Sequence, residues 1–330
     1  MITTERKIDL LVELGNFLQE NNTEMQEVKF KAAQANAWFT EAHINLAINN
    51  ITTQFLQKNK LITWMKHYKP THTPQKVGIV MAGNIPLVGF HDFLCGFMSG
   101  HKLLLKLSTK DEVLLTYIIK LLIIWEPEIA EYVQIADRLN GCDAYIATGS
   151  NNTARYFEQY FGKQPHIIRK NRTSVAIIDG AESEAELLAL GEDVYFYYGL
   201  GCRNVSQICV PKEYDFVPLL NTFNKYNYYA DLNKYKNNYD YHLAIYLLNR
   251  VPYMSNESLL LVENALPFSA VSVLHYRYYD DKNALLYELK QSTDIQTIIG
   301  DGFTPFGESQ QPALNDYPDG VDTMEFLINL

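Results

Sequence analysis

Blocks of basic charge are absent from this sequence of 330 residues. Lysine and arginine number 28 against 38 acidic residues, so the net charge is −10 at pH 7. A protein that captures nucleic acid or an anionic membrane through electrostatics needs a basic block. We therefore expect no nucleic-acid partner, and any phosphate that the protein binds must be held by local contacts.

A membrane-spanning run and a secretory signal are also missing. The most apolar stretch, from Val113 to Trp125, is interrupted by Thr116 and Lys120, which leaves it too short to cross a bilayer. The first twenty residues lack the basic region, apolar run and small-residue cleavage site of a signal peptide. We expect a cytoplasmic protein that does not insert into a membrane.

Paired cysteines are the third absence. The four cysteines, at positions 95, 142, 202 and 209, form no CxxC motif and have no metal-ligand spacing. Such a pattern indicates reduced thiols in a cytosolic protein and predicts no metal site. At most one of these cysteines needs a chemical role.

The spacing of apolar residues changes near residue 70. Before it, apolar residues such as Leu10, Leu14 and Leu18 recur at helical spacing, which predicts a helical N-terminal segment over 1–70. After a linker rich in Pro and Thr, short apolar strands alternate with helices, as in a parallel sheet with crossover helices. We expect strands at 77–81, 102–108, 132–136, 143–148, 166–169 and 174–179.

This order of elements predicts an α/β fold with two domains, which agrees with a hydrophobic content of 47% in a chain of this length. A Rossmann-like nucleotide-binding domain is expected over 71–180, with its ligand at the carboxyl ends of the strands. A smaller α/β catalytic domain is expected over 181–310, and a C-terminal tail over 311–330.

Two loops contain candidate catalytic residues. Cys202 follows Gly199-Leu200-Gly201 between a predicted helix and a strand, where a sharp turn would leave the thiol accessible as a nucleophile. Asn84 lies in the loop 81–86, which follows the first strand but lacks the GxGxxG phosphate motif. Its amide could donate to an oxyanion. The alternatives are a small buried cysteine and an ordinary turn residue.

Six segments in this order resemble motifs of the aldehyde dehydrogenase superfamily over about residues 75 to 310. The resemblance is stronger to its acyl-CoA reductase branch, which includes the fatty acid reductases of bacterial luminescence. The segments are AGNIP (82–86), LLLKLS (103–108), ATGS (147–150), GLGC (199–202), ENALPF (263–268) and TPFGES (304–309).

The resemblance implies that Cys202 carries the acyl group and that Asn84 and the Cys202 backbone N–H hold the oxyanion. It also implies a nicotinamide cofactor, with NADPH favoured over NADH. A helix that starts at Ser150 would place its N-terminus near the pyrophosphate. The residues implied to bind the cofactor are Lys106, Ser108, Thr148, Gly149, Ser150, Glu263 and Phe306.

One departure from the superfamily bears on the reaction. Where hydrolytic members carry Glu-Leu-Gly-Gly, this chain has IRKNRTSVAII (168–178), which contains no carboxylate. A missing general base disfavours attack by water on the thioester. The expected activity is therefore the reduction of an acyl-CoA to an aldehyde through acyl-Cys202. The chain is also shorter than most relatives, which leaves the acyl pocket and the contacts of a homo-oligomer unspecified.

Three alternatives stay open at this stage. An acyl-phosphate reductase of the same superfamily would share the fold, the cysteine and the cofactor. A non-catalytic scaffold would share only the fold. A Cys-His hydrolase would need His91, His101 or His166 as a partner, but none lies in a recognisable local motif.

Overall fold

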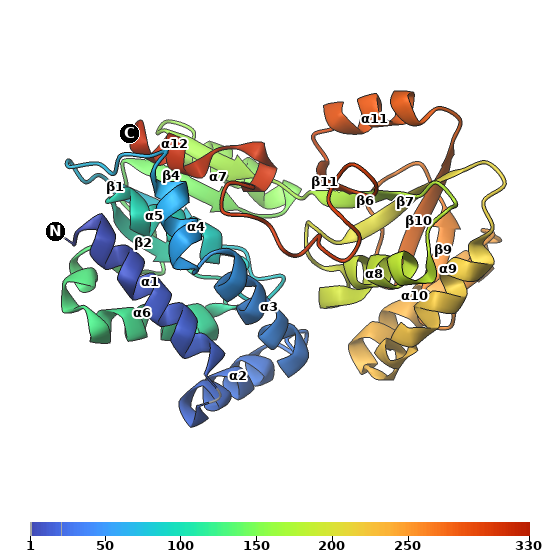
Figure 1. Ribbon diagram of the computed structural model, residues 1–330, viewed down its shortest axis with the longest axis horizontal. Coiled ribbons are helices and arrows are strands. Elements are labelled where there is room, and N and C mark those ends of the chain that lie inside the picture. The colour runs from blue at the N-terminus through green and yellow to red at the C-terminus, as the bar shows by residue number, and fades with distance from the viewer. Residues whose placement is uncertain (1, 21) are drawn as a thin grey trace. The chain divides into compact units, whose positions relative to one another are not determined.

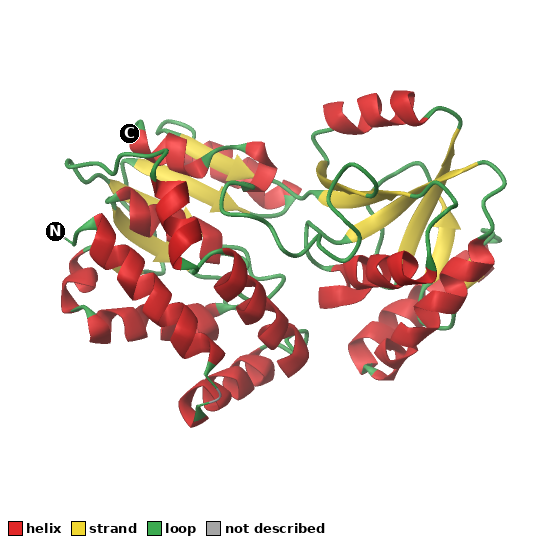
Figure 2. Cartoon of the chain, in the orientation of Figure 1, coloured by secondary structure: helices red, strands yellow, loops and turns green. Residues whose placement is uncertain are grey.

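The structure is a computed structural model that describes residues 2–20 and 22–330. The chain divides into two compact units, one formed by Met1–Asn171 with Pro312–Leu330 and the other by Arg172–Gln311. Each unit is a parallel or mostly parallel sheet flanked by helices (Figures 1 and 2).

The first unit is built on a five-stranded sheet in the order β3-β2-β1-β4-β5, with all strands parallel. The carboxyl ends of these strands therefore lie along one edge, and the chain order reverses between β1 and β4. Such a reversal is where open α/β sheets bind their ligands. The bounds are β1 Lys76–Val80, β2 Lys102–Lys106, β3 Val133–Ile135, β4 Ala144–Thr148 and β5 His166–Arg169.

Alternation along the strands places helices on both faces of this sheet. Leu103 and Leu105 belong to the large core shared with the N-terminal helices, whereas Leu104 packs with Tyr145 and Phe161 in a separate cluster. The helices are α1 Thr4–Gln19, α2 Thr23–Ala35, α3 Glu41–Gln54, α4 Lys58–Met65, α5 Phe90–Ser99, α6 Glu112–Trp125, α7 Asn151–Phe161 and α12 Thr323–Ile328, with the 3-10 turns η1 Pro127–Glu131 and η4 Pro318–Gly320.

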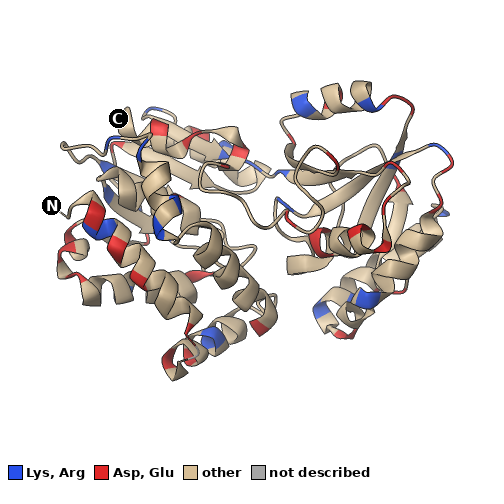
Figure 3. Ribbon diagram, in the orientation of Figure 1, with Lys and Arg blue, Asp and Glu red and all other residues tan. Residues whose placement is uncertain are grey.

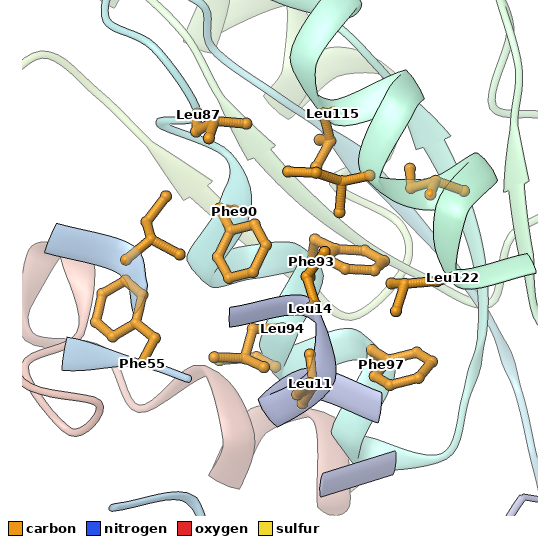
Figure 4. Packing of buried hydrophobic residues seen from close by; sticks show 14 of the residues in the cluster. Leu11, Leu14, Phe55, Leu87, Phe90, Phe93, Leu94, Phe97, Leu115 and Leu122 are labelled. Carbon is orange, nitrogen blue, oxygen red and sulfur yellow. The ribbon is translucent and has the colours of Figure 1, made fainter. Parts of the chain in front are cut away.

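The helical N-terminal segment is not separate from the first sheet. Leu11 and Leu14 of α1 pack against Phe93 and Phe97 of α5, as Figure 4 shows. A single apolar core of this extent stabilises the helices and the sheet together, because each buried apolar side chain contributes about 1.5 to 3 kcal/mol.

The final residues are not a tail, which corrects the expectation for 311–330. Helix α12 packs on α5, and the Trp64 indole N–H donates to the Tyr317 hydroxyl at 2.8 Å. The Tyr68 hydroxyl donates to the Asp322 carboxylate at 2.6 Å. Local sequence patterns do not predict these hydrogen bonds, because the partners lie far apart in the chain.

The second unit is built on a six-stranded sheet in the order β11-β6-β7-β10-β9-β8, in which only the short β8 runs antiparallel. Helix α11 covers one face, where Leu285 and Leu289 pack on Val175 and Cys209. The bounds are β6 Thr173–Ile177, β7 Val205–Pro211, β8 Met254–Ser255, β9 Leu260–Glu263, β10 Val273–Tyr279, β11 Ile295–Ile299, α8 Glu184–Tyr195, η2 Phe196–Gly199, α9 Phe216–Phe223, η3 Asn224–Asp231, α10 Asn233–Asn249 and α11 Lys282–Gln291.

The position of β6 corrects the expected domain boundary. The sequence suggested that 174–179 adds a strand to the first sheet and that the domains change near 180. Strand β6 instead pairs with β7 and β11 of the second sheet, so the boundary lies between Asn171 and Arg172. The sequence of a strand that is apolar on both faces does not specify the sheet to which the strand belongs.

Lys and Arg residues are interspersed with Asp and Glu residues along both units (Figure 3). Among the described residues, no helix is both long and apolar enough to cross a membrane.

Candidate active site

The expected site residues fall into two sets, one in each unit. The first set lies at the carboxyl edge of the first sheet. Asn84 follows β1, Lys106 ends β2, and Thr148 ends β4, which is the neighbour of β1 on the other side. Parallel pairing thus brings together three segments that are far apart in the sequence.

The loop that carries Asn84 is held by a buried carboxylate. Leu87 has a left-handed backbone with φ of 57°, which is costly for a leucine, by about 1 to 3 kcal/mol. Its N–H donates to Asp111 Oδ2 at 2.7 Å, and the N–H of Val88 bonds to the same carboxyl group. Asn84 itself is exposed. The buried anchor fixes the turn while leaving the Asn84 side chain accessible.

A second contact fixes the loops after β1 and β2 against each other. A Cβ atom placed on Gly83 would lie 2.5 Å from Ser108 Oγ, so only glycine permits this approach. Ser108 Oγ also accepts from the Lys110 N–H at 3.3 Å. Lys106 ends β2 two residues before Ser108 and is exposed.

Ser150 caps helix α7. Its hydroxyl accepts from the Thr153 N–H at 3.3 Å, and the first turn of α7 carries no acidic residue. The helix N-terminus is exposed and offers backbone N–H groups and a positive dipole end. Gly149 precedes the cap and lies close to the Thr153 side chain, so the ATGS turn packs on its own helix.

The second set centres on Cys202, which is half-buried. The Ser174 hydroxyl donates to the Cys202 carbonyl at 3.0 Å and ties the loop to β6. Asn204 lies two residues later and is 1% exposed. Its Oδ1 accepts from the Gly201 N–H at 2.8 Å, so both sides of the cysteine are fixed by hydrogen bonds.

The backbone just before this loop is strained. Tyr197 and Tyr198 both have left-handed backbones, with φ of 52° and 58°. Asn204 Nδ2 donates to the carbonyls of Asp193, at 2.9 Å, and Phe196, at 2.8 Å. One amide side chain therefore holds the chain before and after the strained pair.

Polar side chains on the central strands anchor the segment that contains Glu263. Gln207 Nε2 donates to the Asn264 carbonyl at 2.9 Å, and the Ser206 hydroxyl donates to the Pro267 carbonyl at 2.5 Å. The ring of His275 bonds to the Leu266 carbonyl at 2.8 Å, and burial lowers the pKa of this histidine. Glu263 ends β9 and is exposed.

Helix α8 anchors the segment that contains Phe306. The Asp193 carboxylate accepts from the N–H groups of Gly307, at 2.7 Å, and Ser309, at 3.0 Å. Gly307 has φ of 83° and packs on Ala189, one turn before Asp193. Phe306 lines a cavity of about 580 Å³ within this unit, bounded by α8 and the loop after β11.

The other cysteines and the candidate histidines have structural roles. Cys95, Cys142 and Cys209 are buried, and burial raises the pKa of each thiol. The three histidine rings bond to carbonyls of their own unit: His91 to Leu314, His101 to Leu327 and His166 to Gln164. Within residues 2–20 and 22–330, no group of acidic, His and Cys side chains is arranged to hold a metal ion.

Arg169, the last residue of β5, lies in the core of the first unit. Arg169 is 2% exposed, and its guanidinium donates to the Asp92 carboxylate of α5 and to the Thr323 hydroxyl of α12. The positive charge is thus neutralised within the first unit. No carboxylate lies between 168 and 178 to act as a base.

Among the residues that hold these loops, sequence reasoning missed Asp111, Asp193 and Asn204. Asp111 follows the LLLKLS motif and Asn204 follows GLGC, so their proximity to motifs was a signal. Asp193 lies in a helix rich in acidic residues, a composition typical of a solvent-exposed helix, but its side chain is buried and the residue is 1% exposed. A buried aspartate inside a helix is rare without a partner, yet sequence alone does not reveal its partner at position 307.

Comparison with known proteins supports the fold. No protein-family model and no curated protein matches the sequence. Aldehyde dehydrogenase 21 from Physcomitrella patens, in complex with succinate, matches with a TM-score of 0.68 and 10% identity over 91% of this chain and 74% of its own. A putative aldehyde dehydrogenase from Burkholderia cenocepacia matches with a TM-score of 0.62 and 13% identity, over 86% of this chain and 72% of its own.

An NADP-dependent enzyme from E. coli matches with a TM-score of 0.64 and 11% identity over 90% of this chain and 73% of its own. At such identities the likeness concerns the fold. The expected α/β class is confirmed, and the chain has the aldehyde dehydrogenase fold, with a Rossmann-like unit and a second α/β unit that carries Cys202.

Proposed function

We propose that this protein is an oxidoreductase that uses reduced nicotinamide to convert an acyl-CoA into an aldehyde, with Cys202 as the acylated residue. The observation that carries this proposal is the state of Cys202. It is half-buried in a loop fixed on both sides, whereas the other three cysteines are buried. A nucleophilic thiol needs this combination of access and fixed position.

The residues of the first unit fit a dinucleotide. Helix α7 presents an exposed N-terminus without acidic residues, beside the point where the strand order reverses. We assign Lys106 and Ser108 to the adenosine ribose or a 2′-phosphate, an assignment that favours NADPH, and Thr148 to Ser150 to the pyrophosphate. In the second unit, Glu263 and Phe306 are assigned to the nicotinamide end.

The proposed chemistry at Cys202 is that of a thiolate nucleophile. The Cys202 thiolate attacks the thioester carbonyl, and the CoA thiolate leaves, so that one thioester replaces another. The family resemblance assigns the Asn84 amide and the Cys202 backbone N–H to the oxyanion of the tetrahedral intermediate. A reduced nicotinamide, when bound, supplies the hydride that brings the acyl group to the level of an aldehyde. Collapse of the thiohemiacetal then releases the aldehyde and the Cys202 thiolate.

Acylation can be tested without the cofactor. The protein is mixed with acyl-CoAs of different chain length, released CoA is measured, and the adduct is located by peptide mass spectrometry. We expect about one CoA per chain and a label on Cys202. Cys202→Ala should abolish both signals, whereas Cys142→Ala, the matched control, should retain them.

The alternatives are distinguished by repeating this experiment with an acyl phosphate. An acyl-phosphate reductase would be acylated by an acyl phosphate and not by any acyl-CoA. A scaffold would be acylated by neither. A label on another cysteine, or turnover by Cys202→Ala, contradicts the assignment.

A further inference from the structure

We propose that Asn204 is a positioning residue that holds Cys202 in its reactive place, and that Asp193 anchors the Phe306 segment to the same turn of helix α8. The two residues form one buried clamp, with Asp193 contributing its carbonyl to Asn204 and its carboxylate to the backbone of 307–309. This inference rests on the proposed function, because it assigns Cys202 to acyl transfer and Phe306 to the cofactor.

The strain before Cys202 explains why a clamp is needed. Two successive residues with left-handed backbones, Tyr197 and Tyr198, lie between the end of α8 and the cysteine loop. Backbone in this region relaxes unless surrounding contacts prevent it. Asn204 binds two carbonyls before the strained pair and the Gly201 N–H after it. Removal of the Asn204 amide frees the segment to shift Cys202.

The contacts of Asp193 concern a different segment. The carboxylate accepts two backbone N–H groups of the Pro-Phe-Gly loop, and the close packing of Gly307 on Ala189 brings that loop onto α8. Loss of the carboxylate leaves these N–H groups without their acceptor and releases Phe306. The Asn204 contacts, which use the backbone carbonyl of Asp193, remain. The two halves of the clamp are therefore separable by mutation.

The test compares Asn204→Ala and Asp193→Ala in the full chain, with Asn256→Ala as a matched control. Asn256 is also buried in the second unit. It accepts from the Leu259 N–H at 2.9 Å and donates to the Tyr195 hydroxyl at the end of α8 at 3.1 Å, but no hydrogen bond joins it to the Cys202 loop or to the 307–309 segment. For each variant we measure the rate of CoA release on acylation, the rate of Cys202 alkylation by iodoacetamide, the binding constant of NADPH and the melting temperature.

We expect Asn204→Ala to slow CoA release and change Cys202 alkylation by roughly tenfold to a hundredfold, with NADPH binding unchanged, because a displacement of about 1 Å has effects of that size. Asp193→Ala should weaken NADPH binding about tenfold, the equivalent of one lost hydrogen bond, and leave CoA release within about twofold. Asn256→Ala should lower the melting temperature to a similar extent without altering either reaction parameter.

Equal changes in all parameters for the three variants would show a structural role alone and overturn the proposal. If Asn204→Ala does not fold, Asn204→Asp takes its place, because it keeps an acceptor for Gly201 and loses both donated bonds. The alkylation rate needs no substrate. Failure of the wild type to release CoA would therefore count against the proposed function, and unchanged alkylation in the Asn204 variants would count against the clamp.

Discussion

Asp111 holds Leu87 in a left-handed backbone conformation through a hydrogen bond of 2.7 Å from the Leu87 N–H to Oδ2. Leu87 is 3% exposed and packs above Phe90 in the core (Figure 4), so the turn is fixed from both the polar and the apolar side. Burial raises the pKa of the Asp111 carboxyl well above its usual range, and the N–H groups of Leu87 and Val88 oppose this shift.

Asp111→Ala should therefore lower both stability and turnover. The buried N–H groups lose their acceptor, at a cost of about 1 to 3 kcal/mol in the free energy of unfolding, and the loop that carries Asn84 relaxes. Urea unfolding and the rate of aldehyde formation check this. Asp215→Ala, which removes an exposed cap of α9, should cost about 1 kcal/mol and leave turnover unchanged. Normal turnover in Asp111→Ala would separate this anchor from catalysis.

Asn84→Ala should reduce turnover by about a hundredfold, as expected for a lost oxyanion donor. Binding of the reduced cofactor, followed by its fluorescence, should be retained because the backbone of the loop stays anchored at Asp111. A variant with wild-type turnover would identify Asn84 as an ordinary turn residue.

Lys106→Ala and Glu263→Ala should each raise the binding constant of the cofactor, since the two side chains are assigned to opposite ends of one dinucleotide. A lost charge-assisted hydrogen bond to a phosphate corresponds to about tenfold or more. Lys106→Ala should weaken NADPH more than NADH, as titration with both cofactors can measure. Equal use of NADH and NADPH, together with unchanged NADPH binding in Lys106→Ala, contradicts the assignment.

The sequence predicted what depends on local pattern. Apolar runs between turn residues located the strands of the first sheet, and short motifs located the loops after β1, β2 and β4. The prediction that β6 belongs to the first sheet was wrong, because the pattern of a buried strand does not specify the strands with which it pairs. The anchors Asp111 and Asp193 were missed for a similar reason, since Asp193 bonds to a backbone N–H at position 307, far along the chain.

Asp193 should also give the second unit a pH-dependent stability. Burial raises the pKa of this carboxyl to about 6 from the usual 3.8, and the N–H groups of Gly307 and Ser309 partly oppose the shift. The folded state then binds the proton more tightly than the unfolded state between these values. The free energy of unfolding should fall by about 3 kcal/mol as the pH rises from about 4 to about 6, and stay level above.

Urea unfolding followed at several pH values between 4 and 7 measures this slope. Asp193→Asn should remove it, because the amide does not titrate. Asp280→Asn is the control, since Asp280 is exposed and should leave the slope as it is in the wild type. A slope that persists in Asp193→Asn would mean that a group other than Asp193 causes it.

The last prediction concerns the fate of the acyl-enzyme. The segment where a hydrolytic enzyme carries its general base consists here of Arg169, Lys170, Asn171 and Arg172. Arg169 forms a buried ion pair with Asp92. A positioned base commonly accelerates attack by water roughly 10²- to 10⁴-fold, so the thioester at Cys202 should persist without it. With NADPH present, one cofactor should be oxidised per aldehyde released, and little free acid should form.

A pre-steady-state experiment checks this order of events. The protein is mixed with acyl-CoA alone, and a burst of CoA close to one per chain should be followed by a plateau. Addition of NADPH should then release aldehyde, while addition of CoA instead should regenerate acyl-CoA, because the CoA thiolate attacks the same thioester. Continuous release of free acid without cofactor would mean that another group activates water. The protein would then act as a thioesterase or a hydrolytic dehydrogenase, with the same acyl-Cys202 but a different acceptor.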